Sequence, residues 1–318
     1  MARGCRAAAH YDSTVPSLSA IVPATNDPPT LDLCTSAIAA ALEPPEEVIV
    51  VRDRTLMGPA AARNEGARRA KGDVLVFIDS DVVVHDDVFT RIRAAFENNP
   101  ALEGVFGSYD DDPAAPGIVS RFRNLLHHHV HHASAGPATT FWGGLGALRR
   151  ETFERTGGFD EQRFRLPSVE DIELGMRLHE RGARIVLDPA VQGTHLKAWS
   201  LYDMVRTDLV RRGIPWVQLL LERRTGASAL NLSWRHRLST ATVLVGLVAL
   251  ARRHHVVAVG SAAGLVAINR SFYALLTRRL GPHGALVGIG LHAIHLLTAA
   301  LAVPTALVAR YRGRETRR

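Results

Sequence analysis

The chain has 318 residues, of which 47% are hydrophobic and 22% charged, and a formal net charge of +7. This composition excludes a largely disordered protein, and the length allows one domain of roughly 200 residues beside a smaller region. Residues 223–318 hold 14 Lys and Arg against one acid, whereas residues 1–222 hold 24 against 30 acids. Because the basic tail is also strongly apolar, it predicts contact with anionic lipid and not with nucleic acid.

The start of the chain carries no sign of an export signal. Residues 1–15 lack the apolar stretch of a signal peptide, so we expect residues 1–16 to form a disordered leader. The cysteines, Cys5 and Cys34, make no disulfide framework. A reducing, cytoplasmic location for the front of the chain therefore fits.

Strand and helix patterns then alternate along the chain. Short β-branched runs predict strands, and the segments between them have helical composition. The predicted strands are 19–24, 47–51 and 73–79, and the predicted helices are 31–42 and 59–70. This order predicts an α/β domain with a mostly parallel, twisted sheet and helices on both faces. In such sheets ligands collect at the carboxyl ends of the strands.

The third predicted strand ends in Asp79-Ser80-Asp81. Since residues i and i+2 of an extended segment point the same way, the carboxylates of Asp79 and Asp81 can converge on one ligand. Oxygen ligands suit Mg²⁺ or Mn²⁺, ions that usually also bind substrate phosphates. For an isolated pair of this kind, a solvated turn after the strand is the alternative.

Several stretches together resemble the family 2 glycosyltransferases, inverting enzymes of the GT-A fold that use nucleotide-sugar donors. They cover about residues 17–200 and read SAIVPATND, EVIVVRDRT, GPAAARNEGARRAKGDVLVFIDSD, GGFDE and VEDIELGMRLHERG. The resemblance implies a GT-A nucleotide-diphospho-sugar transferase fold over residues 17–226. It also implies a UDP- or GDP-linked sugar as donor and Mg²⁺ or Mn²⁺ as cofactor.

The resemblance assigns donor contacts to five residues. Pro23 and Thr25 fall where the family lines its base pocket, and Asp53 falls on the acid that bonds uracil or ribose. Arg63 and Asn64 match the arginine and asparagine of the helix that lies against the nucleotide.

The resemblance also assigns the chemistry. Asp79 matches a ribose or metal contact, Asp81 the metal ligand under the diphosphate, and His195 a further metal or diphosphate ligand. Asp171 matches the general base. Two alternatives stay open: Ser168-Val-Glu-Asp171 also has the order of a helix capping box, and a lone His such as His195 is often a packing residue.

The chain departs from the family pattern in the donor loops. Residues 52–55 read RDRT in place of the usual acidic-acidic-Gly-Ser turn, and Thr25 replaces an aromatic, so both UDP and GDP stay open. No Q-x-x-R-W motif follows the E-D pair, and RRGIPW is a loose echo of it. A single-sugar transferase is therefore favoured over a processive synthase.

Two further segments stand out beyond the strand pattern. Residues 127–132 read HHHVHH without the spacing of a tetrahedral metal site, which favours a membrane-proximal or acceptor-side helix with partly protonated rings. Trp142, in FWGGLG, suits an acceptor-side wall on which a sugar can stack, or simple packing.

The tail, residues 227–318, predicts a helical membrane region. Apolar runs at 238–251 and 256–268 are short, whereas 285–309 is long enough to span a bilayer. Arginines flank every run, so the charge rule selects no single topology. We expect two or three membrane segments at the cell membrane, with the catalytic domain cytoplasmic. A buried helical subdomain is the alternative.

The sequence therefore favours a membrane-associated inverting glycosyltransferase with a lipid-linked or cell-envelope glycan acceptor. One alternative is a haloacid-dehalogenase-type phosphatase, because a strand followed by Asp79-x-Asp81 also fits that family's nucleophile motif. The other is a non-catalytic, membrane-anchored sugar-nucleotide binder.

Overall fold

The computed structural model describes residues 15–25, 27–53, 58–223 and 233–315. The predicted leader, residues 1–16, lies outside the described residues except for its last two. The boundary expected between residues 226 and 227 also lies outside them.

The front of the chain folds around one eight-stranded mixed sheet. Its first three strands pair in parallel, with a helix after each of the first two, so the predicted βαβαβ start is confirmed. These elements are β1 (Leu18–Thr25), α1 (Leu31–Ala40), β2 (Glu47–Asp53), α2 (Pro59–Arg69) and β3 (Val74–Ile78). Helix α1 ends two residues before the expected end at residue 42.

The other strands extend the sheet with both pairing directions. The order across the sheet is β2-β1-β3-β7-β5-β8-β4, with β6 paired to β8. Strand β7 runs antiparallel to both β3 and β5, whereas β5 and β8 are parallel. The bounds are β4 (Val82–Val84), β5 (Gly104–Tyr109), β6 (Gly136–Ala138), β7 (Leu145–Arg149) and β8 (Ile185–His195).

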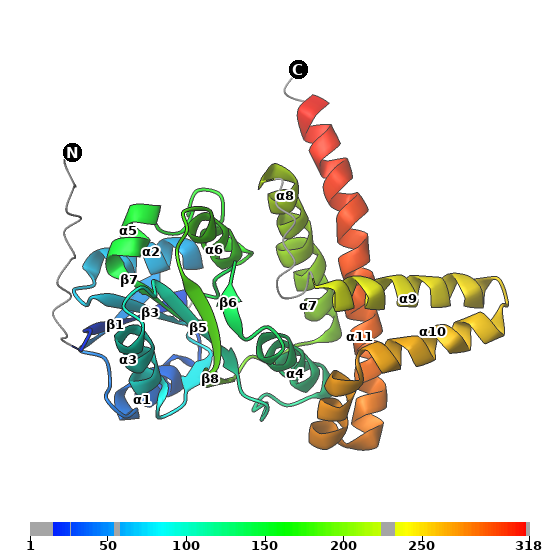
Figure 1. Ribbon diagram of the computed structural model, residues 1–318, viewed down its shortest axis with the longest axis horizontal. Coiled ribbons are helices and arrows are strands. Elements are labelled where there is room, and N and C mark those ends of the chain that lie inside the picture. Colours follow the sequence, from blue (N-terminus) through cyan, green and yellow to red (C-terminus); the bar gives the residue numbers. More distant parts are fainter. Residues whose placement is uncertain (1–14, 26, 54–57, 224–232, 316–318) are drawn as a thin grey trace, which may run out of the picture.

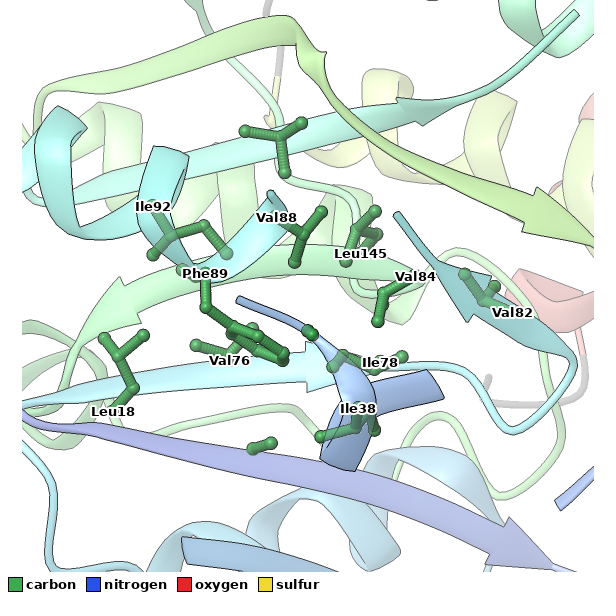
Figure 2. Close-up of a cluster of buried hydrophobic side chains, with 14 of the residues drawn as sticks. Leu18, Ile38, Val76, Ile78, Val82, Val84, Val88, Phe89, Ile92 and Leu145 are labelled. Carbon is green, nitrogen blue, oxygen red and sulfur yellow. The ribbon is translucent and has the colours of Figure 1, made fainter. Parts of the chain in front are cut away.

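Helices cover both faces of the sheet, as expected (Figure 1). Val76 and Ile78 of β3 pack with α1 and α3 (Val88–Asn98), in the cluster that Figure 2 shows. The alternate residues Leu75 and Phe77 pack with α2, α5 (Arg150–Thr156) and α6 (Glu170–Glu180). Each fully buried side chain of this kind contributes about 1.5–3 kcal/mol, which makes the strand a rigid support for the polar residues that follow it.

The chain ends in a set of helices joined to the sheet domain through α4 (Ile118–His132). Phe122 of α4 packs with Met204, Phe272 and Leu276 in a third apolar cluster. The remaining helices are α7 (Leu201–Arg206), the π-helix η1 (Thr207–Gly213), α8 (Ile214–Arg223), α9 (Trp234–Ala251), α10 (His255–Ile268) and α11 (Arg270–Glu315). Helix α11 bends at Gly281, whose φ is +72°, before Pro282.

One described segment, Arg270–Tyr311 of α11, is long and apolar enough to cross a membrane by length and composition. It contains the run 285–309 that the sequence singles out. In the folded chain, 39% of its most apolar window is buried against other parts of the protein.

Candidate active site

The turn after β3 carries the two aspartates and is tied to two other strands. The Asp79 N–H donates to the Gly144 carbonyl at 2.9 Å, just before β7, and the Leu196 N–H donates to the Asp81 carbonyl at 2.8 Å, just after β8. Strand β4 then pairs antiparallel to β8 with Val82 opposite His195. This register brings Asp81 and His195 side by side although 114 positions separate them in the sequence.

Asp81 and His195 form a partly open polar pair. Their Oδ2 and Nε2 atoms lie 3.7 Å apart, with side-chain exposures of 27% and 9%. The His195 ring stacks on Tyr109 with centroids 4.2 Å apart, which fixes its orientation. Burial raises the pKa of Asp81, but the bond to His195 and the charges of His195 and Lys197 outweigh it, so the net pKa lies below the ordinary value. Asp81 is therefore an ionised carboxylate at neutral pH.

Such a pair fits the way Mg²⁺ or Mn²⁺ is held with a substrate phosphate, because these ions keep few protein ligands. Among the residues the structure describes, no group of three or more His, Cys, Asp and Glu side chains is arranged to hold a metal ion. Asp79, which the resemblance also assigns to the metal, turns its Oδ1 to Arg63. Its role as a metal ligand stays a prediction.

Arg63 is the central cation of the site. Helix α2 starts at Pro59, directly after Gly58, whose φ is +83° and where a Cβ would lie 2.2 Å from the Arg165 carbonyl oxygen. This start aims Arg63 between β3 and α6, where Nη2 lies 2.6 Å from Asp79 and Nη1 lies 3.1 Å from Glu170.

The ion pair between Arg63 and Asp79 shifts the pKa of both groups. Burial lowers the pKa of Arg63, but the carboxylates of Asp79 and Glu170 raise it by more, so the net pKa is above the ordinary value and the side chain stays cationic. The pKa of Asp79 is raised, chiefly by burial and with help from Asp81, against the opposing charge of Arg63. Asp79 is therefore the less acidic of the two aspartates in the turn.

Asp171 lies in the first turn of α6 with both oxygens oriented. Oδ1 accepts from its neighbour Ile172 at 2.8 Å, and Oδ2 accepts from the Gly143 N–H at 3.2 Å. Burial and the charge of Glu170 raise its pKa to about 6, against the opposing charge of Arg63. A carboxylate with a pKa near the working pH is suited to accept a proton.

The capping-box alternative for this segment is wrong. The residue before α6 is Val169, and no side chain caps the helix. Ser168 instead donates its hydroxyl to the Arg211 carbonyl at 2.6 Å, while Glu170 accepts from the Ser168 N–H at 2.8 Å. The Ser168 hydroxyl thus links the segment before α6 to η1 and does not cap α6.

Asn64 holds a turn, and no ligand is needed to satisfy it. Its Oδ1 accepts from the Phe159 N–H at 2.9 Å, and its Nδ2 donates to the Phe159 carbonyl at 2.9 Å and to Glu161 at 2.7 Å. Gly158 adopts φ +68° beside it, where a Cβ would lie 2.7 Å from Asn64 Oδ1. Asn64 therefore positions the GGFDE turn, whose Phe159 ring lies under Arg63 at 5.4 Å. A contact with the nucleotide stays a prediction.

The three predicted base and ribose contacts lie on neighbouring strands. Pro23 and Thr25 end β1, where they pair in register with Val51 and Asp53 of β2. Pro23 is buried and Thr25 is half-buried. The Asp53 backbone lies at the same edge of the sheet, and its side chain is outside the described part of the structure.

The sequence did not reveal a cluster of rings beside the metal pair. The Tyr109 ring, which stacks on His195, also lies 4.2 Å from the His127 ring and 4.9 Å from the Trp142 ring. Strand β5, helix α4 and the loop before β7 supply these rings. Residues 127–132 and Trp142 stand out in the sequence, but no local pattern predicts that their rings meet around Tyr109. His131 completes the cluster at 5.2 Å from Trp142.

The histidine tract therefore belongs to packing. His128 and His131 bond the carbonyls of Tyr109 and Gly107 at 2.9 and 2.8 Å. Burial lowers the pKa of His127 well below its ordinary value and that of both His129 and His131 to about 4. These three rings are neutral near pH 7, contrary to the expected partial protonation.

Comparisons with known proteins agree with the geometry. Residues 35–157 match the model of glycosyl transferase family 2. An uncharacterized glycosyltransferase of Haemophilus influenzae is 28% identical over 144 residues, which are 41% of this chain and 44% of that protein. Validoxylamine A glucosyltransferase of Streptomyces hygroscopicus subsp. limoneus is 27% identical over 230 residues, 54% of this chain and 49% of that protein. The chain thus matches less than half the length of either relative.

A solved mannosyltransferase of Pyrobaculum calidifontis, in complex with GDP-Man and Mn²⁺, has a TM-score of 0.55 to this chain. It is 18% identical and covers 91% of this chain and 87% of its own, so it shares the fold. The family match includes Asp79 and Asp81, which removes the basis of the phosphatase alternative. Residues 35–157 thus carry the match to glycosyl transferase family 2. The chain as a whole shares the GT-A fold of the solved mannosyltransferase.

Proposed function

We propose that the protein is a membrane-associated inverting glycosyltransferase that moves a single sugar from a nucleotide-diphosphate sugar to an acceptor hydroxyl or phosphate. The observation that carries the proposal is the meeting of two polar groups at one edge of the sheet. One is the ionised carboxylate of Asp81 beside His195, and the other is Asp171 with its pKa of about 6. A phosphate-bound cation and a proton acceptor are the two parts that such a transfer requires.

In this proposal Asp81 and His195 hold Mg²⁺ or Mn²⁺ together with the donor diphosphate. The ion supplies positive charge to the leaving diphosphate. Asp171 takes the proton of the acceptor, whose oxygen attacks the anomeric carbon from the face opposite the diphosphate. The sugar is transferred in one displacement, and no covalent bond to the protein forms.

Arg63 keeps the two parts of the site apart and oriented. Its guanidinium spans from Asp79 at the end of β3 to Glu170 at the start of α6. Gly143 lies against it, because a Cβ there would be 3.4 Å from Arg63 Cζ and 3.6 Å from the Asp171 Cβ. This contact fixes the position of the Gly143 N–H, which donates to Asp171 Oδ2, so Arg63 and Gly143 together orient the Asp171 carboxylate.

The donor is proposed to lie along the ends of β1 and β2. Pro23, Thr25 and Asp53 would face its base and ribose, and Asn64 would act through the turn that it holds. Both UDP and GDP sugars belong in the test, since the solved mannosyltransferase of the same fold was obtained with GDP-Man and Mn²⁺.

The acceptor is proposed to be a lipid-linked or cell-envelope glycan precursor. The apolar segment Arg270–Tyr311 and the excess of basic residues after residue 222 support a position at the cell membrane. In this arrangement residues 17–226 form the catalytic domain on the cytoplasmic side, and residues 227–318 form the membrane region.

The test is transfer by the full-length protein in membranes. A panel of labelled UDP and GDP sugars is incubated with Mn²⁺ or Mg²⁺, with and without total membrane lipid, and nucleoside diphosphate and labelled lipid are measured. We expect one donor to give both products only when lipid is present. Donor binding without release of nucleoside diphosphate under every condition would favour the non-catalytic binder instead.

A further inference from the structure

The hairpin of α9 and α10 exposes apolar side chains around its whole surface. The two helices pack on each other and on α11, and they project away from the sheet domain (Figure 1). Their exposed apolar residues include Leu244, Val245, Leu247, Val248, Leu250, Val256, Val257 and Val259. Val256 and Val259 are 87% and 69% exposed. A helix that is apolar all round is suited to a lipid surrounding and not to lying flat on a surface.

The two helices meet through small residues. A Cβ on Gly246 would lie 3.1 Å from the Ser261 Cβ, and one on Gly264 would lie 3.6 Å from a Thr242 methyl group. At the base of the hairpin, buried Asn269 donates to the Ser239 hydroxyl at 2.8 Å. Close contacts between small residues and hydrogen bonds between helices are how helices associate in lipid, where burying apolar surface drives nothing.

Positive charge marks both ends of the hairpin. Arg252 and Arg253 form its tip, and Arg235, Arg237 and Arg270 lie at its base. No acidic residue occurs between residues 223 and 314. The 18 residues of α9 and the 14 of α10 give lengths of about 27 and 21 Å, shorter than the roughly 30 Å of a bilayer's hydrocarbon core. Local thinning of the bilayer and long arginine side chains that reach the headgroups can close such a mismatch. The charges therefore match two layers of anionic headgroups on either side of an apolar stretch.

Helix α11 is the longer apolar helix, but its contacts argue against crossing a bilayer. It packs along α4, η1 and α8, and two of these helices, α4 and η1, carry the buried ion pair of Arg123 and Asp208. His295 on its inner face bonds Asp208 at 2.7 Å, and the Arg121 side chain donates to the Arg279 carbonyl at 2.9 Å. If α11 crossed the hydrocarbon, these charged partners would be drawn in with it.

The outer face of α11 suits the membrane surface. Leu286, Leu301 and Val308 are 71%, 58% and 51% exposed, while Leu296, Ala302 and Ala306 are buried against the protein. A helix with one packed face and one apolar, open face lies in the plane of the interface. In Figure 1 the hairpin runs across α11, so a bilayer parallel to α11 receives the hairpin end-on.

We propose that the α9–α10 hairpin is the element that crosses the lipid bilayer, with α11 lying in the near interface. Arg252 and Arg253 then reach the far headgroups, because the bilayer centre is the costliest depth for them. The base of the hairpin continues into the helices that pack on the catalytic domain, so it lies on the same side of the membrane as that domain. This inference rests on the membrane association in the proposed function and specifies how it is achieved.

The arrangement also sets where the site lies. Helix α4 packs on α11 and carries His127, whose ring contacts Tyr109 beside Asp81 and His195. The side of the site formed by these rings is therefore held close to the near membrane surface, where a lipid-linked acceptor presents its headgroup.

The first test measures depth in the bilayer with the full-length protein. In a Cys5→Ser background, buried Cys34 does not react, since burial raises the pKa of its thiol to about 12. The fluorophore NBD is attached at Val245→Cys or Val266→Cys, exposed positions nearer the middle of the hairpin's length, or at the matched exposed positions Leu301→Cys or Val308→Cys in α11. The protein is reconstituted into vesicles of phosphatidylcholine and phosphatidylglycerol that carry a doxyl quencher either deep or near the headgroups.

We expect the deep quencher to act most strongly on the two hairpin positions and the shallow quencher on the two α11 positions. Stronger deep quenching at α11 than at the hairpin would overturn the inference while leaving membrane association intact. If no position is quenched and the protein does not float with the vesicles, membrane association itself fails. Donor binding measured by calorimetry on the same samples reports the catalytic part of the proposed function separately.

The second test asks whether the tip crosses. His254→Cys is exposed to a membrane-impermeant maleimide in sealed inverted vesicles, whose cytoplasmic face is outward. We expect labelling only after detergent opens the vesicles, whereas a Cys placed at exposed Asp32 of the catalytic domain is labelled without detergent. Equal labelling of position 254 before and after opening would show that the tip stays on the cytoplasmic side and would overturn the crossing arrangement.

Discussion

The sheet domain and the helical tail sort their side chains in opposite ways. All five residues of β3 are apolar and fully buried, and the charged groups stand beyond the strand end. In the tail Val256 is 87% exposed, while His292 and Asn269 are buried. Apolar residues inside and charges outside suit water, and the reverse suits lipid. The contrast between the two regions agrees with the membrane position proposed for the tail.

The site and the helices that pack on the tail each contain a buried ion-pair network, and the pKa shifts in the two networks differ. In the site Arg63 bonds Asp79 and Glu170, and the pKa values of Asp79 and Asp171 are raised. Where the tail packs on the rest of the chain, Asp208 of η1 lies 3.0 Å from Arg123 of α4 and 2.7 Å from His295 of α11. Burial raises the pKa of Asp208, but Arg123 and His295 outweigh it and bring the net pKa below the ordinary value. The first network leaves Asp171 with a pKa of about 6, and the second joins α4, η1 and α11.

The strongest test of this contrast is Asp171→Asn. The change keeps the shape of the side chain and removes its proton acceptor, so sugar transfer should fall by roughly 10²- to 10⁴-fold with donor affinity unchanged. Calorimetry measures donor affinity, and mass spectrometry measures transfer. Asp32→Asn, in the exposed first turn of α1, is the matched control and should transfer at the wild-type rate. Transfer by Asp171→Asn at the wild-type rate would remove Asp171 as the base.

Asp208→Ala should affect stability where Asp171→Asn affects rate. It leaves Arg123 buried without its carboxylate, which costs about 3–5 kcal/mol of unfolding free energy. Thermal unfolding of the full chain in detergent measures the loss. Glu222→Ala frees the exposed Arg163 in the same way and should cost at most about 1 kcal/mol. Equal losses in the two variants would contradict the structural role of the Arg123–Asp208–His295 network.

The order of elements at the front of the chain could be predicted from local pattern. The alternation of β-branched runs and helical segments fixes β1 to β3, and the spacing of Asp79 and Asp81 marks the end of β3. The antiparallel insertion of β7 between β3 and β5 could not be predicted, because it pairs residue 76 with residue 147. Contacts at that separation leave no periodic trace in the sequence.

The candidate site was predictable in part, for the same reason. The resemblance predicts Asp171 as the base, and that role stays a prediction. The capping box that the order Ser168-Val-Glu-Asp171 also allows does not form, because the Ser168 hydroxyl donates to the Arg211 carbonyl, 43 positions away. The pairing of Glu170 with Arg63 and the rings around Tyr109 also depend on contacts between distant segments. In the tail, run length selects residues 285–309 as the span, yet length carries no information about the packing of α11 on α4 and α8.

The metal pair gives a smaller, graded effect within the site. Asp81→Ala should abolish Mn²⁺-dependent donor binding, and His195→Ala should weaken it by roughly 10- to 100-fold, the usual cost of a lost partner at a metal site. Both side chains stand at the edge of the sheet, so unfolding temperatures should change little. Titration of donor with and without Mn²⁺ measures the effect, and His85→Ala, a histidine bonded to Asp110 outside the site, is the control. Unchanged metal dependence in both site variants would remove the assignment.

The pH dependence of transfer gives the mildest test, since it alters no residue. With a pKa of about 6, Asp171 loses its proton as the pH rises through that value, so kcat/KM should fall about tenfold for each pH unit below it and level off above it. Asp81 does not titrate in this range, because its pKa lies below the ordinary value.

The raised pKa of Asp171 also affects stability, because the folded protein favours the protonated form of Asp171. This contribution to the free energy of unfolding is fully present below the ordinary pKa of aspartate and is lost as the pH rises through about 6. Asp171→Asn should remove this slope from the unfolding free energy and leave its residual transfer nearly independent of pH between about 5 and 7. A wild-type profile that stays flat through pH 6, with the stability slope retained in Asp171→Asn, would assign the titration to another member of the Arg63 network.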